Sequence, residues 1–115
     1  MTDRELLELA AKAAGIEHGA DRTECDLSLT ENGRHRSLPK WNPLTDDGDA
    51  LRLAVKLGMV VSICDHPDLM EVEASVFPNG RPSSLMFREI YINDPYAATR
   101  RAIVRAAAEI GRAMP

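Results

Sequence analysis

Three aspartates lie close together in the run WNPLTDDGDA, which begins at Trp41. Carboxylate oxygens are the ligands that magnesium and calcium prefer, so Asp46, Asp47 and Asp49 are candidate metal ligands. The run lacks the spacing of an EF-hand calcium loop, because apolar residues stand where the later ligands are needed. The same aspartates precede a segment with helical periodicity, and a helix N-terminus favours side-chain oxygens and negative charge. We therefore predict that they cap a helix and that no metal or cofactor is bound.

The two cysteines and three histidines could supply zinc ligands or a nucleophile with its base. They are Cys25, Cys64, His18, His35 and His66. None has the C-x-x-C or H-x-x-x-H spacing of a zinc site, and Cys64 ends an apolar stretch typical of a core cysteine. Cys64 and His66 would project from one side of a strand, but no glycine-rich elbow or third orienting group accompanies them. The G-x-S-x-G, P-loop and dinucleotide motifs are absent, so the sequence favours a protein that is not an enzyme.

Arginines gather in the last predicted helix. Arg101, Arg105 and Arg112 share one face at about 100° per residue, and Arg100 flanks that face or packs near the sheet. Residues 97–115 hold four arginines and one glutamate, a charge of +3, which leaves −7 for the rest of a chain whose total is −4. One interpretation is a contact for phosphate or for an acidic protein surface. We favour a solvated helix face, because arginines are favourable near a helix C-terminus and nucleic-acid binders usually add aromatic or lysine support.

Trp41 is the only tryptophan and lies at a turn, because Pro43 disfavours helix at the residue before it. It could be an exposed anchor for another protein or a side chain buried against the helix that follows. Its place at the entrance to that helix favours burial. The candidate interaction surface consists of Arg100, Arg101, Arg105, Arg112 and Trp41.

Length and composition indicate one domain. A chain of 115 residues is long enough for one core and too short for two. No apolar run approaches the roughly 20 residues of a membrane span, and the acidic start MTDRELLELAA is unlike a secretory signal. Isolated cysteines suit a reducing cytoplasm. The net negative charge opposes binding of nucleic acid or anionic membrane by the molecule as a whole.

Helix signals are clear at both ends of each helical segment. We predict helices over 3–14, 46–57 and 95–113. Thr2 and Glu5 have the spacing of a capping box, and Gly15 and Gly58, each followed by a hydrophobic residue, have the pattern of left-handed C-caps. Asp94-Pro95 is an N-cap followed by proline at the first helical position.

Apolar stripes predict which faces of the helices are buried. The helix over 46–57 carries Leu51 and Val55 beside its main stripe, so we expect it to be mostly buried. On the last helix the stripe consists of Tyr96, Thr99, Ile103, Ala106, Ala107, Ile110 and Met114.

Strands are expected over 59–64, 69–77 and 84–92. The second alternates apolar and polar residues, which predicts one face in water, and Asn79-Gly80 predicts a hairpin turn to the third. Hydrophobic residues on both sides of the third predict a central strand or one covered twice. Between 17 and 40 the pattern is weak, and Asn32-Gly33 marks either a short hairpin or a loop.

These elements predict an α/β (α+β) fold in a single domain, 1–115. The strands need covering and three amphipathic helices are available. We therefore expect a small antiparallel sheet with helices on both faces, a three-layer α/β/α sandwich.

The run from Trp41 to Ala50 stands with an N-terminal LLELAAKAAGI and a C-terminal D-P-x-x-A-x-R-R-A-I-V-R-A-A. In this combination the chain resembles small phage and prophage proteins of the phage α-β-α (ABA) sandwich family. The resemblance implies an α/β/α sandwich and an accessory role in the cytoplasm of a bacterial host, and it implies no reaction. We therefore expect a non-enzymatic protein that binds an unidentified host or phage protein and no membrane. The alternative is weak nucleic-acid binding through the arginine face.

Overall fold

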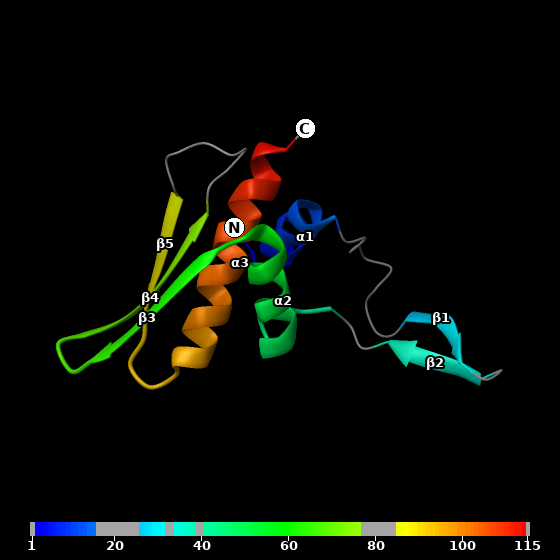
Figure 1. The fold of residues 1–115 in the computed structure, drawn as a ribbon, viewed down its shortest axis with the longest axis horizontal. Helices are drawn as coiled ribbons and strands as arrows, with labels where there is room; N and C mark the ends of the chain where they lie inside the picture. The colour runs from blue at the N-terminus through cyan, green and yellow to red at the C-terminus, as the bar shows by residue number, and fades with distance from the viewer. Residues whose placement is uncertain (1, 16–25, 32–33, 39–40, 77–84, 115) are drawn as a thin grey trace.

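The computed structural model describes residues 2–15, 26–31, 34–38, 41–76 and 85–114 (Figure 1). Its elements are α1 (Asp3–Ala14), β1 (Asp26–Glu31), β2 (Arg34–Leu38), α2 (Asp47–Leu57), β3 (Val60–His66), β4 (Leu69–Val76), β5 (Leu85–Ile90) and α3 (Pro95–Ala113). Within these residues the fold is α+β, with three helices and a three-stranded antiparallel sheet against which α3 packs, and this fold class is as the sequence predicts.

Helix ends follow from local hydrogen bonds. The Thr2 hydroxyl accepts from the Glu5 amide and the Glu5 carboxylate accepts from the Thr2 amide, both at 3.2 Å, which completes the capping box. Gly15 and Gly58 end α1 and α2 in the left-handed region, with φ of 71° and 63°, where a side chain would be strained. The predicted caps are confirmed.

The three-stranded sheet has the order β3-β4-β5 and is antiparallel throughout. Val60 lies opposite Ser75 in the first pair, and Val76 lies opposite Leu85 in the second. The pairing of β4 with β5 is as predicted, and the turn at Asn79-Gly80 lies outside the described residues. The prediction of a central or doubly covered last strand is wrong, because β5 is an edge strand of the described sheet and its Met86 and Ile90 are 54% and 80% exposed.

Of the two alternatives predicted for 17–40, a short hairpin or a loop, the structure has the hairpin: β1 and β2 pair antiparallel with Glu31 opposite Arg34. Its turn, Asn32-Gly33, lies outside the described residues. In Figure 1 this hairpin extends away from the helices and the larger sheet. It therefore does not contribute to the surfaces discussed below.

Helix α3 forms the middle layer, because both of its sides are buried. One side joins a cluster with α1 and α2, and the other joins a cluster with the sheet. The first side presents Ile103, Val104, Ala107 and Ala108. The second presents Ala98, Ala102 and Ala106 to Val72, Ala74 and Val76 of β4. Small alanine side chains allow both neighbours to approach closely.

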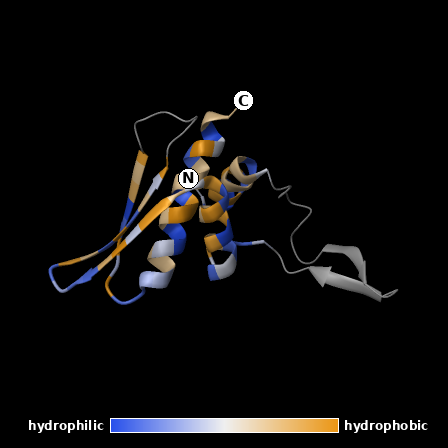
Figure 2. Ribbon diagram, viewed as in Figure 1, coloured by the Kyte–Doolittle hydropathy of each residue, from blue (hydrophilic) through white to orange (hydrophobic). Residues whose placement is uncertain are grey.

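The order of layers is therefore the sheet, then α3, then α1 with α2 (Figure 1). In the described part of the chain, α3 is the helix that covers the sheet, and α1 and α2 pack on the far side of α3, so the finer expectation of helices on both sheet faces is not met there. Hydrophobic and hydrophilic residues succeed one another along the strands (Figure 2). The outer face of β4 carries Glu73, which pairs with Arg88 of β5 at 2.8 Å. This solvated face of β4 agrees with the predicted alternation.

Two predicted burial patterns differ from the structure. Leu51 and Val55 of α2 are 64% and 73% exposed, because α3 and α1 cover only the opposite side of that helix. Tyr96 and Met114, which were expected in the buried stripe of α3, are 67% and 39% exposed. A middle-layer helix buries alanines on two sides, so its large apolar residues do not define its buried face.

Gly111 fixes the distance between α3 and α1. A Cβ atom at this position would lie 1.9 Å from the Leu9 carbonyl oxygen and 2.8 Å from its carbonyl carbon. Both obstacles are backbone atoms of a helix and cannot rotate away. The close approach of the two helices therefore requires glycine at this position.

Of the helices in the described part of the chain, none combines the length and apolar character needed to cross a membrane.

Candidate interaction surfaces

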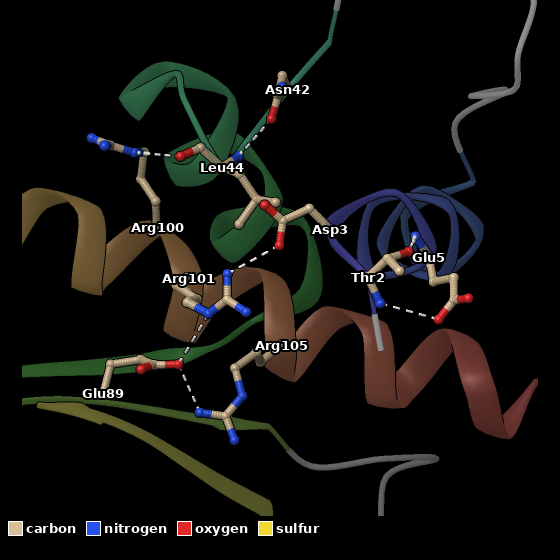
Figure 3. A network of polar contacts seen from close by, with 9 residues as sticks. All are labelled: Thr2, Asp3, Glu5, Asn42, Leu44, Glu89, Arg100, Arg101 and Arg105. Carbon is tan, nitrogen blue, oxygen red and sulfur yellow. Dashed lines mark hydrogen bonds and ion pairs between the residues drawn. The ribbon is translucent and has the colours of Figure 1, made fainter.

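The aspartates of the run after Trp41 hold a turn and a helix N-terminus. Asp46 is the N-cap of α2 and accepts from the Asp49 amide at 2.8 Å, which confirms the predicted capping. Asp49 accepts from the Asn42 amide at 3.0 Å and from Arg52 at 2.7 Å. The Asn42 side chain in turn accepts from the Leu44 amide at 3.0 Å (Figure 3). Asp46 and Asp49 are therefore engaged within their own segment.

Asp47 fastens the same segment to α3. Arg100 donates from Nε to the Leu44 carbonyl at 2.9 Å and pairs with Asp47 through NH1. The Arg100 side chain is only 18% exposed, so this ion pair is partly shielded from water. Arg100 therefore packs toward α2, and not toward the sheet, which was one of the two positions that the sequence left open.

A charged flank connects α1, α3 and β5, and we define it as Asp3, Glu89, Arg101 and Arg105 (Figure 3). Glu89 accepts from Arg105 at 2.7 Å and lies 3.7 Å from Arg101. Arg101 also donates to Asp3 at 3.2 Å. Arg105 further donates to the Arg88 carbonyl at 3.1 Å, and its guanidinium lies 5.6 Å from the centre of the Phe87 ring. The partners of both arginines come from other elements of the same chain.

Arg112 lies apart from this network, near the end of α3. Its side chain is 65% exposed, and its nearest acidic partner in the described residues is Glu109 at 4.0 Å. The structure thus brings Arg101 and Arg105 together with acidic residues and does not gather four free arginines on one surface. Trp41 is half-buried and packs against the cluster formed by α1, α2 and α3.

The cysteine and histidine candidates do not converge. Cys64 is a half-buried free thiol. His66 follows it by two residues on β3, so both side chains lie on the outer face of the sheet. His66 Nδ1 accepts from the Asp68 amide at 3.1 Å within the turn to β4. Cys25 and His18 lie outside the described residues, as does the side chain of His35. No group of three or more His, Cys, Asp or Glu residues in the described segments is arranged to hold a metal ion.

Tyr91 connects the end of β5 to the opposite edge of the sheet. It is buried, and its hydroxyl donates to the Cys64 carbonyl at 3.0 Å. Burial raises the pKa of Tyr91 above 10.0, and the neighbouring Asp65 carboxylate raises it further. The hydroxyl is therefore held in its neutral, donating form.

An apolar groove lies between α2 and β3, on the opposite flank of α3 from the charged flank. Its volume is about 420 Å³. The apolar lining residues are Ala50, Leu51, Ala54, Val61, Ile63 and Ile103, with Tyr96 also in the wall. Asp47, Thr99 and Arg100 supply the polar part of the lining. Leu51, Ile63 and Tyr96 are each more than half exposed, so the groove presents large apolar side chains to solvent.

The sequence signal for this groove is a second apolar stripe on α2, a pattern that is equally typical of a buried helix. Leu51 and Val55 make a second apolar stripe on α2, beside the stripe that packs on α3. A helix that is apolar on two sides is either covered twice or offers one side to a partner. Which of these holds depends on elements distant in sequence, so the pattern alone does not decide it.

No family model, no curated protein and no solved structure matches this chain. The two flanks of α3 are therefore interpreted from their own geometry.

Proposed function

We propose that this chain is a phage- or prophage-encoded accessory protein that acts without catalysis, by docking a protein on the apolar groove. The observation that carries the proposal is the group of exposed apolar side chains around the groove, contributed by Leu51, Ile63 and Tyr96. Exposed apolar residues that gather at a concave site are typical of protein-binding surfaces. The resemblance of the Trp41 run to phage proteins supports the accessory role. It also supports a place in the bacterial cytoplasm, where a free thiol such as Cys64 persists.

The test uses a photo-crosslinking residue at position 51, with the same residue at position 92 as the matched control. Ile92 is 84% exposed and lies outside the groove, so the control has an equally accessible probe. In bacteria that express the chain, we expect a defined protein adduct from position 51 and none from position 92. Adducts from both positions at equal yield, or turnover of a small molecule by the purified chain, would overturn the proposal.

The alternative proposal, nucleic-acid binding through the arginine face, has fewer free charges to support it than the sequence suggested. Arg100, Arg101 and Arg105 are paired with Asp47, Asp3 and Glu89. Charge reversal at Arg101 or Arg105 would place an acid beside Glu89 and would disturb the fold as well as the surface. Glu89→Gln is the better test, because it keeps the side-chain shape and releases both arginines.

Under the docking proposal, neither the wild type nor Glu89→Gln binds duplex or single-stranded DNA at low salt. Tighter binding by Glu89→Gln, lost on adding Arg112→Ala, would support the alternative. The dependence of that binding on salt would then have a log–log slope of about −0.9 for each phosphate contacted.

A further inference from the structure

β3 is an edge strand of the three-stranded sheet. In the order β3-β4-β5, β3 pairs with β4 alone among the strands that the structure describes. Over Val60–Cys64 its sequence has no charged residue, proline or glycine, which are the residues that usually protect an edge strand from pairing with another chain, and Asp65 and His66 stand at its end. The apolar groove runs along the inner face of this strand, through Val61 and Ile63. An unpaired edge and an exposed apolar surface therefore coincide.

The other edge strand, β5, has the protection that β3 lacks. Its sequence, LMFREI, contains Arg88 and Glu89. Glu89 holds the guanidinium groups of Arg101 and Arg105 beside the strand, at 3.7 and 2.7 Å. Charged groups on and beside an edge oppose pairing with a second sheet. The two edges therefore differ in their suitability for association.

We propose that the protein docked at the apolar groove is a second copy of this chain, joined by antiparallel pairing of the two β3 strands. This inference rests on the proposed function and names the partner of that same surface. The paired sheet would be continuous through both copies. A two-fold axis perpendicular to the sheet would relate the copies, as in most homodimers.

The pattern of β3 favours a register centred on Ser62. Only a register that keeps both inner faces on one side of the joined sheet is allowed, since a one-residue slip exchanges the faces. With Ser62 opposite Ser62 of the other copy, Val61 lies opposite Ile63 and Val60 opposite Cys64, so apolar residues pair along the seam. Centring the pair on Ile63 would place Val61 opposite the Asp65 carboxylate, which is unfavourable.

The helices beside the strands fit the same symmetry. Because α2 and β3 line the same groove, the two-fold axis would place the two grooves side by side, with the two α2 helices antiparallel. Leu51 and Val55, 64% and 73% exposed in one copy, would then cover each other across the axis. The N-terminal end of each α2 would face the C-terminal end of the other, which carries Lys56. Antiparallel helix dipoles favour this arrangement.

The first test is the mass of the purified full chain in sedimentation equilibrium over a wide range of concentration. We expect the wild type to reach twice the monomer mass. Ile63→Lys adds a charge to the open edge and should raise the dimer dissociation constant by at least about tenfold. Ile90→Lys is the matched control, since Ile90 is also an exposed isoleucine on an edge strand. It should dimerise like the wild type.

The second test reports the register and does not depend on the stability of an Ile63 variant. Ser62→Cys in a background of Cys25→Ser and Cys64→Ser should give a covalent dimer on mild oxidation, because directly opposed residues are close enough for a disulfide. Ser75→Cys, on the same outer face but on the central strand, is the control and should remain monomeric.

Each outcome of these two tests either supports or overturns the inferred dimer. A dimer that survives Ile63→Lys, or that is lost equally with Ile90→Lys, overturns the inference, as does crosslinking by Ser75→Cys alone. A chain that stays monomeric at every concentration also overturns it. In that case an adduct of a different protein at position 51 would keep the proposed function, and absence of any adduct would remove both.

Discussion

The two flanks of α3 use their side chains in opposite ways. On the charged flank, Arg101 and Arg105 are long cationic side chains that find Asp3 and Glu89 in the same chain. On the other flank, Leu51 and Ile63 are apolar side chains that remain exposed beside the groove. The arginines that the sequence presents as a free cationic face form ion pairs within the chain. The apolar residues that the sequence presents as buried are exposed to solvent. The chemistry of a helix face therefore indicates a partner only after the neighbouring elements are placed.

Gly111→Ala is expected to have the largest effect, because it moves the helix that carries both flanks. The added Cβ meets the Leu9 backbone at 1.9 Å, so α1 and α3 must separate. We expect a loss of about 1–3 kcal/mol in the free energy of unfolding, although alanine is the better helix former. Denaturant unfolding measures this directly.

Gly48→Ala is the control for helix propensity. A Cβ there would meet only the flexible end of Arg52, at 3.1 Å, and the Asp46 carboxylate, at 3.2 Å. Its stability should be unchanged or slightly higher. Equal and small effects of the two glycine variants would show that the contact of α1 with α3 is not as close as described.

Glu89→Gln addresses the charged flank alone. It removes the carboxylate that Arg101 and Arg105 share while keeping the side-chain volume. Because Glu89 is only 21% exposed, we expect a loss of about 1–2 kcal/mol in the free energy of unfolding, within the range for hydrogen bonds to charged groups. Glu71→Gln, on the outer face of β4, is the matched control and should change stability by less than about 0.5 kcal/mol. No difference between the two variants would mean that the charged flank contributes nothing to folding.

Tyr91 joins the two edges of the sheet, and its ionisation gives a pH-dependent test of that link. Its pKa is raised in the folded state, so the neutral form contributes stability below pH 10.0 that is lost as the pH rises through the folded-state pKa. In a Tyr96→Phe background, where Tyr91 is the remaining tyrosine, tyrosinate absorbance should titrate at higher pH in the native protein than in denaturant. Identical titrations in the two states would contradict the buried hydrogen bond to the Cys64 carbonyl.

Leu51→Ser should have the smallest effect on stability, because the groove flank of α3 contributes less to folding than the charged flank. The side chain is 64% exposed, so its removal in the monomer should change the free energy of unfolding by about 0.5 kcal/mol or less. Measured at a protein concentration where the chain is monomeric, a loss as large as that of Glu89→Gln would show that Leu51 belongs to the core and that the groove is closed.

Much of the fold follows from local signals in the sequence. The caps at Thr2, Gly15, Gly58 and Asp94 define the helix ends, and their hydrogen bonds depend on residues within a few positions. The alternation of β4 likewise reports its two faces correctly. Local chemistry therefore suffices for the elements and for the antiparallel sheet.

The arrangement of layers does not follow in the same way. Burial of α3 on two sides depends on alanines such as Ala98 and Ala107, whose small side chains give little periodic contrast. The ion pair of Arg101 with Asp3 joins residues that are 98 positions apart, so the last helix alone looks like a free cationic face. The groove exists because α1 and α3 cover only one side of α2. The sequence of α2 does not show which of its sides other elements cover.

The most direct test of the contrast between the flanks is amide hydrogen exchange as a function of protein concentration, read on β3 and β5 in one experiment. Both are edge strands, so their outward amides should exchange rapidly in dilute solution. As concentration rises, we expect protection to increase over Val60–Cys64 and to stay constant over Leu85–Ile90. Protection that grows on β5 while β3 remains unchanged would contradict the assignment of the apolar groove as the surface that binds another protein.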